Sequence, residues 1–147
     1  MNRHGSSERG PVVGGSTRGG AGRRVNEDSL WIPRNLSQTL LVRKGYLYVV
    51  ADGIGGHQKG EVASRLAVET IRRTYYEDPN PDVVASLRRA VEIANAEIHR
   101  QAQNPAYGGM GSTVAAVVVR GDKLVVANVG DSRAYLLDGD RLELMTA

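Results

Sequence analysis

The sequence predicts an α+β domain whose sheet is antiparallel. Segments with strand character come first, two segments with helical character follow, and strand character then returns. Short turns such as Lys44-Gly45 and Asp138-Gly139 join neighbouring strand segments, which favours hairpins over helical crossovers. This separation of strands from helices is typical of antiparallel α+β domains.

Three strands are expected before the helices. The first, Ser29–Ile32, stops at Pro33, because proline cannot continue a strand ladder. The second covers Thr39–Arg43, and Lys44-Gly45 turns the chain into the third, Tyr46–Ala51.

Two helices are expected next, as an antiparallel pair that covers a sheet. The first runs over Glu61–Tyr75 and is amphipathic, with Ser64 on its polar face. Asn80 as N-cap and Pro81 at the first helical position begin the second, which continues to Gln103. Its apolar positions repeat at intervals of three and four: Val84, Leu87, Val91, Ala94 and Ile98.

Four strands are expected after the helices: Ser112–Val119, Leu124–Val129, Ala134–Leu137 and Arg141–Leu144. The first is continuously apolar, so we expect it to be buried on both faces. The polar stretch Gly130-Asp131-Ser132-Arg133 interrupts the series.

Composition excludes several classes of protein. The chain has 147 residues, a net charge of +3 and no cysteine, which suits one domain in a reducing cytoplasm without disulfides or thiolate metal sites. The arginines are scattered and aromatic residues make up 5%, so no nucleic-acid partner is expected. No apolar run is long enough for a membrane span, and no secretory signal is visible. Residues 1–16, rich in Gly, Ser and Arg, predict a disordered arm.

The apolar run Leu47–Ala51 ends in one carboxylate, Asp52, followed by Gly53, Gly55, Gly56 and Gly60. Glu61 stands where a P-loop needs lysine, and the glycine spacing does not match a dinucleotide fingerprint or a calcium loop. Two interpretations remain: a seat for a hard divalent cation beside exposed backbone, or a tight strand–helix connection with an ordinary turn aspartate.

Other acidic residues lie at expected strand ends or turns. Glu27 and Asp28 precede the first strand, and Asp131 follows a later one. They could be a capped turn and an Asx-turn, or they could converge with Asp52 on a divalent metal. Arg23 would then suit phosphate oxygens, because its planar fork matches them. Metal, arginine and glycine together favour phosphoryl chemistry over acyl transfer, and no G-x-S-x-G elbow is present.

Four motifs, in order along the chain, resemble the bacterial form of the metal-dependent type 2C (PPM) serine/threonine protein phosphatases. They are Thr17-x-x-Gly20-x-x-Arg23-x-x-Asn26-Glu27-Asp28, Val50–His57 with Gly60–Ser64, Gly109–Val114, and Val129–Tyr135. The resemblance defines a partial phosphatase domain at residues 17–147, after the arm at 1–16.

The resemblance implies an antiparallel β-sandwich flanked by helix pairs. It implies two Mn²⁺ or Mg²⁺ ions bridged by Asp52, with the Gly53 carbonyl as a further ligand. Glu27 and Asp28 would hold metal-bound waters or position the site, Arg23 would bind the substrate phosphate, and Asp131 would help to hold a third, weaker metal. The implied reaction is in-line attack of a metal-activated water on phosphoserine or phosphothreonine.

The resemblance also has two departures. Eukaryotic members have an acid histidine directly after Asp-Gly, where this chain has Ile54, so His57 is expected to be a loop residue. The family's two further metal-binding aspartates lie in a C-terminal half that this sequence lacks, so we expect an incomplete domain.

Two functions therefore compete: a phosphatase of phosphoproteins that a serine/threonine kinase modifies, and an inactive half-domain or pseudophosphatase that binds phosphoproteins. Uncovered sheet is expected to promote self-association.

Overall fold

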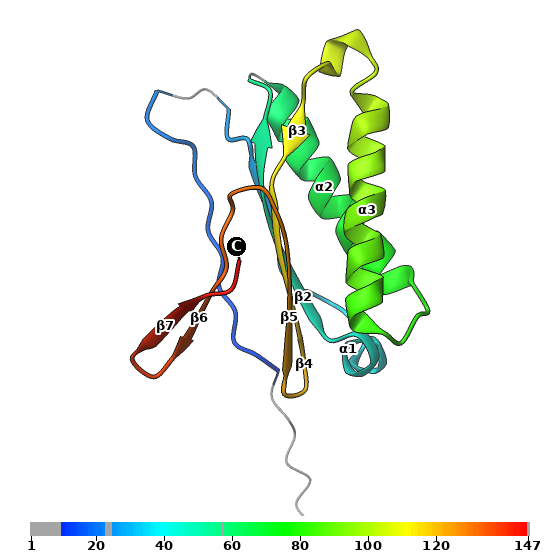
Figure 1. The fold of residues 1–147 in the computed structure, drawn as a ribbon, viewed down its shortest axis with the longest axis vertical. Helices are drawn as coiled ribbons and strands as arrows, with labels where there is room; N and C mark the ends of the chain where they lie inside the picture. Colours follow the sequence, from blue (N-terminus) through cyan, green and yellow to red (C-terminus); the bar gives the residue numbers. More distant parts are fainter. Residues whose placement is uncertain (1–9, 23–24, 57, 147) are drawn as a thin grey trace, which may run out of the picture.

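The computed structural model describes residues 10–22, 25–56 and 58–146 as a sheet with a helix pair on one face (Figure 1). The helices are α1 (Gln38–Lys44), α2 (Gln58–Glu77) and α3 (Val83–Gln101), with a 3-10 turn, η1, at Pro105–Tyr107. The strands are β1 (Asp28–Trp31), β2 (Tyr46–Ile54), β3 (Gly111–Ser112), β4 (Val114–Arg120), β5 (Lys123–Val129), β6 (Tyr135–Asp138) and β7 (Arg141–Leu144).

The main sheet has the order β1-β2-β4-β5, and the short β3 also pairs with β2. Every pairing is antiparallel, and β6 and β7 form a separate hairpin. The predicted α+β class with antiparallel sheet is therefore confirmed.

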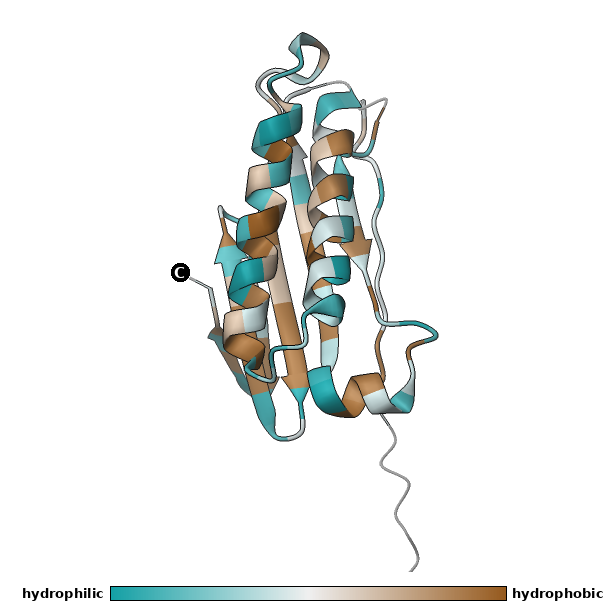
Figure 2. Cartoon of the chain, turned by 90° about the vertical axis from the view of Figure 1, so that its right-hand side faces the viewer, coloured by the Kyte–Doolittle hydropathy of each residue, from teal (hydrophilic) through white to brown (hydrophobic). Residues whose placement is uncertain are grey.

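The core lies between the sheet and the helix pair. Alternate residues of β2 point into it, because successive side chains of a strand face opposite sides; Leu47, Val49 and Ala51 are buried. Figure 2 shows α2 and α3 side by side across this face of the sheet. Their buried side chains include Ala67, Ile71, Tyr75, Leu87, Ala90 and Ala94.

The other face of the sheet has a sparser cover. The N-terminal segment and the β6–β7 hairpin lie on that side (Figure 1). Gly10 and Gly15 lie against the side chains of Tyr46 and Ile32, while Val50 at the middle of β2 remains 52% exposed. The predicted disordered arm at 1–16 stays a prediction, since residues 1–9 lie outside the described residues.

The strand predicted at Thr39–Arg43 is wrong, because these residues belong to α1. The hydroxyl of Ser37 caps this helix by accepting the Leu40 N–H at 3.2 Å. Gly45, at φ 76°, ends the helix and donates its N–H to the Leu41 carbonyl at 2.7 Å.

The second long helix begins later than predicted. Asp82, not Asn80, is its N-cap, and its carboxylate accepts the N–H groups of Val84 and Ala85. Val83 is consequently buried, and Val84, predicted to face the core, is exposed. The predicted single strand Ser112–Val119 is divided into β3 and β4 at Thr113.

Ser64 was predicted on the polar face of α2 but is buried, where its hydroxyl bonds to that of Ser29 at 2.9 Å.

Among the described residues, no helix is long and apolar enough to cross a bilayer.

A buried lysine ties the end of α1 to the α2–α3 connection. Lys44 is 1% exposed. Its ammonium donates to the carbonyls of Asp78 and Asn80 at 3.1 and 3.2 Å, and to the Ser86 hydroxyl at 2.7 Å. The Tyr75 ring lies 4.5 Å from the same nitrogen. Burial lowers the pKa of Lys44, and the nearby Asp78 carboxylate opposes that shift.

Replacing Lys44 with Met is expected to lower the free energy of unfolding by about 2–4 kcal/mol, because buried acceptors lose a charged donor. Urea unfolding measures the change, and Lys123→Met, at an exposed lysine that begins β5, is the matched control. Equal stabilities for Lys44→Met and the parent would contradict this account.

Alkaline pH is expected to destabilise the fold through Tyr76. Burial raises the pKa of Tyr76 to about 12, although the bond from the Leu47 N–H opposes this shift. A raised tyrosine pKa adds stability that is present below the unfolded pKa of about 10 and is lost as the pH rises through about 12. Urea unfolding from about pH 8 to about pH 11.5 should show this decline.

Tyr76→Phe should be less stable than the parent at neutral pH, because Leu47 N–H loses its acceptor, but its stability should fall less steeply above about pH 10. Tyr135→Phe, at an exposed tyrosine, is the matched control for the loss of a tyrosine hydroxyl.

Candidate functional site

Two carboxylates face each other across β1 and β2. The register of this antiparallel pair sets Asp28 directly opposite Asp52. Both residues are exposed, and Asp52 is on the side of the sheet away from the helices, because Ala51 and Gly53 on either side of it are buried. Like charges at facing positions of two strands destabilise the pair unless a cation offsets them.

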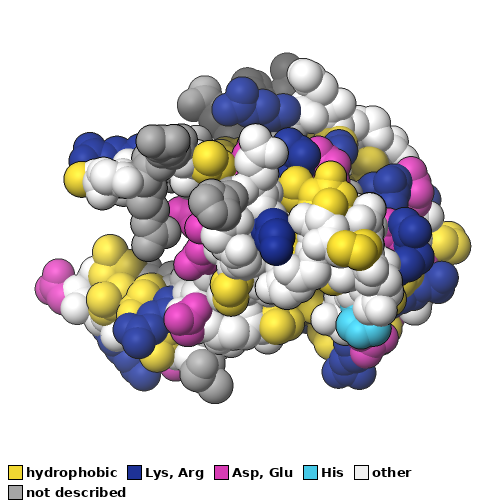
Figure 3. Space-filling view, turned by 90° about the horizontal axis from the view of Figure 1, so that it is seen from above, with side chains coloured by type: hydrophobic (Ala, Val, Ile, Leu, Met, Phe, Trp, Pro, Cys, Tyr) yellow, Lys and Arg dark blue, Asp and Glu magenta, His cyan; other side chains and the backbone are white. Residues whose placement is uncertain are grey.

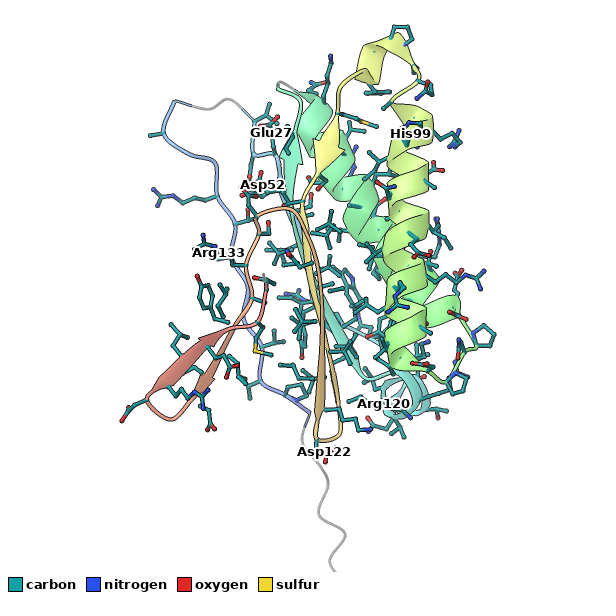
Figure 4. The ribbon with its side chains drawn as sticks, viewed as in Figure 1. Glu27, Asp52, His99, Arg120, Asp122 and Arg133 are labelled. Carbon is teal, nitrogen blue, oxygen red and sulfur yellow. The ribbon has the colours of Figure 1, made fainter. Side chains whose placement is uncertain are left out.

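Glu27, the residue before Asp28, adds a third carboxylate; it lies above Asp52 in Figure 4, and its side chain reaches the first turn of α2 at Gly60. Its carbonyl accepts the Gly53 N–H at 3.0 Å, which fastens the residue before β1 to β2. One of its carboxylate oxygens, Oε1, is buried and receives no hydrogen bond from the described residues. A buried carboxylate oxygen of this kind needs a donor or a cation, so the site has the chemistry that a divalent ion or its bound water would satisfy.

Gly53 and Gly60 allow the end of β2 and the first turn of α2 to touch. A Cβ on Gly53 would collide with the Gly60 carbonyl, and a Cβ on Gly60 would collide with Glu27 Oε1. These two glycines are therefore required for close approach. Gly56, at φ 69°, is instead required for the turn itself.

The backbone of Asp52 is held from the other side by Thr113. The Thr113 hydroxyl accepts the Asp52 N–H at 3.1 Å, and the Thr113 N–H donates to the Asp52 carbonyl at 2.9 Å. The same hydroxyl lies 2.5 Å from that of Ser132. Ser132 follows Asp131, so this contact connects the predicted Asp131 segment to β2.

The structure thus brings Glu27, Asp28, Asp52 and Gly53 together at one end of β1 and β2, and it leaves Asp131 exposed on the loop after β5. Within 10–22, 25–56 and 58–146, no three Asp, Glu, His or Cys side chains come close enough to enclose one ion. Arg23 and His57 lie outside the described residues, so their predicted roles remain predictions.

Sequence reasoning gave no role to Thr113 or Ser132. The sequence offered two signals: Thr113 lies directly before an apolar strand, and Ser132 follows Gly130-Asp131. Neither signal reveals that the two hydroxyls meet, since that depends on the β4–β5 pairing.

Each of the two acidic segments, at 27–28 and at 131, has an arginine nearby. Arg18 lines a pocket of about 210 Å³ together with Glu27 and Asp28. Arg133 follows Ser132, and its bond with the Tyr135 hydroxyl, helped by the Asp131 carboxylate, raises its pKa. Figure 3 shows acidic side chains bordering a recess at the upper end of the molecule. Oxygen ligands next to guanidinium groups suit Mg²⁺ or Mn²⁺ together with an anion such as phosphate.

Comparison with known proteins agrees with this chemistry. The serine/threonine protein phosphatase PstP of Mycobacterium tuberculosis is 36% identical over 124 residues, which cover 83% of this chain and 22% of PstP. The serine/threonine phosphatase stp of Listeria innocua is 33% identical over 129 residues, covering 84% of this chain and 49% of stp.

Solved structures agree as well. A crystal structure of the M. tuberculosis phosphatase matches with a TM-score of 0.69 at 36% identity, over 85% of this chain and 49% of that one. The PstP catalytic domain in complex with two manganese ions matches with a TM-score of 0.68 at 33% identity, over 95% of this chain and 52% of that one.

This chain spans about half the length of these structures and of stp, and less of full-length PstP. The family model for protein phosphatase 2C matches residues 12–147. The chain therefore belongs to the protein phosphatase 2C family.

Proposed function

We propose that this chain carries the metal-binding part of a metal-dependent protein serine/threonine phosphatase centre. The observation that carries the proposal is the facing Asp28–Asp52 pair, together with the buried Glu27 oxygen that receives no hydrogen bond from the described residues. Asp52 and the Gly53 carbonyl would bind two Mn²⁺ or Mg²⁺ ions, with Glu27 and Asp28 around them. Asp131 would help to hold a third, weaker ion.

The chain's own residues would hold and orient the reactants. Bound Mn²⁺ or Mg²⁺ supplies a water of lowered pKa and offsets charge on the phosphoryl group. Arg23 would bind the phosphate of a phosphoserine or phosphothreonine and orient it for in-line attack. Phosphoproteins, and the serine/threonine kinase that modifies them, are the proposed partners, and the cytoplasm is the proposed location.

A second function is binding of phosphoproteins without turnover. It is favoured by one observation: the described acidic residues do not enclose an ion as a group of three. Such a module would bind phosphoproteins through Arg23 and the carboxylates of Glu27, Asp28 and Asp52 but would not release phosphate.

The first test measures Mn²⁺ binding and turnover together. We expect the 147-residue chain to bind Mn²⁺ and to release phosphate from a phosphothreonine peptide. The EPR signal of free Mn²⁺ measures the binding. Asp52→Asn should weaken Mn²⁺ binding at least about tenfold and abolish phosphate release, as a chelator should. Asp122→Asn is the matched control, because Asp122 lies in the β4–β5 turn at the opposite end of the sheet (Figure 4).

The outcomes separate the two functions. Binding of both Mn²⁺ and peptide without phosphate release would favour the binding module. If Asp52→Asn leaves the Mn²⁺ affinity unchanged, the metal-centre proposal is wrong for both functions.

We also propose that the chain associates with itself through apolar surface on the hairpin side. Leu137 and Leu142 face each other across β6 and β7, and they are 66% and 64% exposed. Val50 and Leu124 add exposed apolar surface on the same side of the main sheet. Exposed apolar area of this kind favours association.

Light scattering after gel filtration is expected to show a mass that rises with concentration. The double variant Leu137→Lys/Leu142→Glu keeps a favourable cross-strand pair and should shift the mass toward the monomer. Val84→Lys, at an exposed position on α3, should have no effect. A monomeric parent at every concentration would contradict the proposal.

A further inference from the structure

We propose that Thr113 and Ser132 are positioning residues: their paired hydroxyls hold the segments of Asp52 and Asp131 in the arrangement that binds the metal ion. This inference rests on the proposed metal centre and deepens it. Neither residue is expected to touch the ion or the substrate.

Thr113 fixes both peptide groups of Asp52. It is 5% exposed, and it accepts the Asp52 N–H through Oγ1 and donates its own N–H to the Asp52 carbonyl. The Ser112 hydroxyl adds a longer contact to that carbonyl at 3.3 Å. Because a strand side chain leaves the backbone in a direction set by its peptide groups, these bonds set where the Asp52 carboxylate points.

The Thr113 hydroxyl also contacts the segment that contains Asp131, through Ser132. A hydroxyl has one proton and two acceptor positions, so it can accept from Asp52 N–H and still bond to Ser132 Oγ in either direction. Valine at this position would fill the same space but make neither contact, whereas serine would retain both.

The turn that carries Asp131 is fixed around this hydroxyl pair. The Asn128 side chain donates to the Ser132 carbonyl at 2.8 Å and to the Val114 carbonyl at 3.3 Å. Gly130, at φ 87°, packs so closely on the Thr113 methyl that a Cβ there would come within 2.9 Å of it. The loop from Gly130 to Ser132 therefore rests on Thr113 at two points, and Asp131 lies between them.

A purely structural hydroxyl pair would affect only stability. Groups that orient metal-binding residues also change metal affinity, and their loss typically costs 10–100-fold. The Mn²⁺ dissociation constant therefore separates the two roles, and it can be measured without turnover.

The experiment compares the full chain with Thr113→Val, Thr113→Ser, Ser132→Ala and the double variant Thr113→Val/Ser132→Ala. Thr70→Val, at a buried threonine of α2, is the matched control. Mn²⁺ titration by EPR gives the dissociation constant, and hydrogen exchange reports the Asp52 amide. Only variants that keep a cooperative thermal melt are compared.

We expect Thr113→Val to raise the Mn²⁺ dissociation constant about tenfold and to speed exchange at the Asp52 amide. Thr113→Ser should restore the affinity to within about twofold of the parent, because the hydroxyl is retained. Ser132→Ala should also raise the Mn²⁺ dissociation constant. The double variant should raise it by less than the product of the two single effects, because both changes remove one shared bond. Thr70→Val should bind Mn²⁺ like the parent.

Three results would overturn the inference. One is parent-like Mn²⁺ affinity in Thr113→Val, or in Ser132→Ala if Thr113→Val does not fold. Another is affinity in Thr113→Ser as weak as in Thr113→Val. In these two cases the proposed function stands if Asp52→Asn still weakens binding. The third is a parent that binds no Mn²⁺, which overturns both proposals together.

Discussion

The register of β2 is the constraint on which the rest of the structure depends. Leu47, Val49 and Ala51 must face the helix pair, because their burial forms the core between sheet and helices. Side chains alternate along a strand, so this burial turns Asp52 to the opposite face. A slip of one residue would bury Asp52 under α2 and expose the apolar set. The packing that stabilises the domain thus also orients its central carboxylate.

The neighbours of β2 then act on the same point from different directions. β1 supplies Asp28 opposite Asp52, and the Glu27 carbonyl holds Gly53. The first turn of α2 approaches so closely that a Cβ on Gly53 would collide with the Gly60 carbonyl. Thr113 holds the Asp52 backbone on the remaining side. A carboxylate placed by secondary structure on several sides is more rigid than one on a free loop, and such rigidity would suit the proposed metal centre.

The two faces of the sheet differ in what covers them. Helices α2 and α3 close the inner face, whereas the outer face carries Asp52 together with exposed apolar residues such as Val50. Any polypeptide that packs on those apolar residues comes to lie beside the carboxylates of Asp28 and Asp52. Burying that face would also exclude water from the carboxylates and strengthen their attraction for a cation. The proposed association and the proposed metal binding would therefore be physically linked.

The sequence by itself determined the features that depend on neighbouring residues. These are the helix pair, the hairpin turn at Asp138-Gly139, the succession of strands after the helices, and a glycine-flanked Asp52 at a strand end. Tertiary structure decided the rest. Residues 39–43 are an exception: their composition is strand-like, but neighbouring residues, the Ser37 cap and the Gly45 stop, make them helical. Ser64 is buried because Ser29 meets it from β1. The facing of Asp28 with Asp52, and the meeting of Thr113 with Ser132, depend on strand pairing between distant segments. Local propensity contains no information on such pairing, because its energy comes from contacts that exist only in the folded sheet.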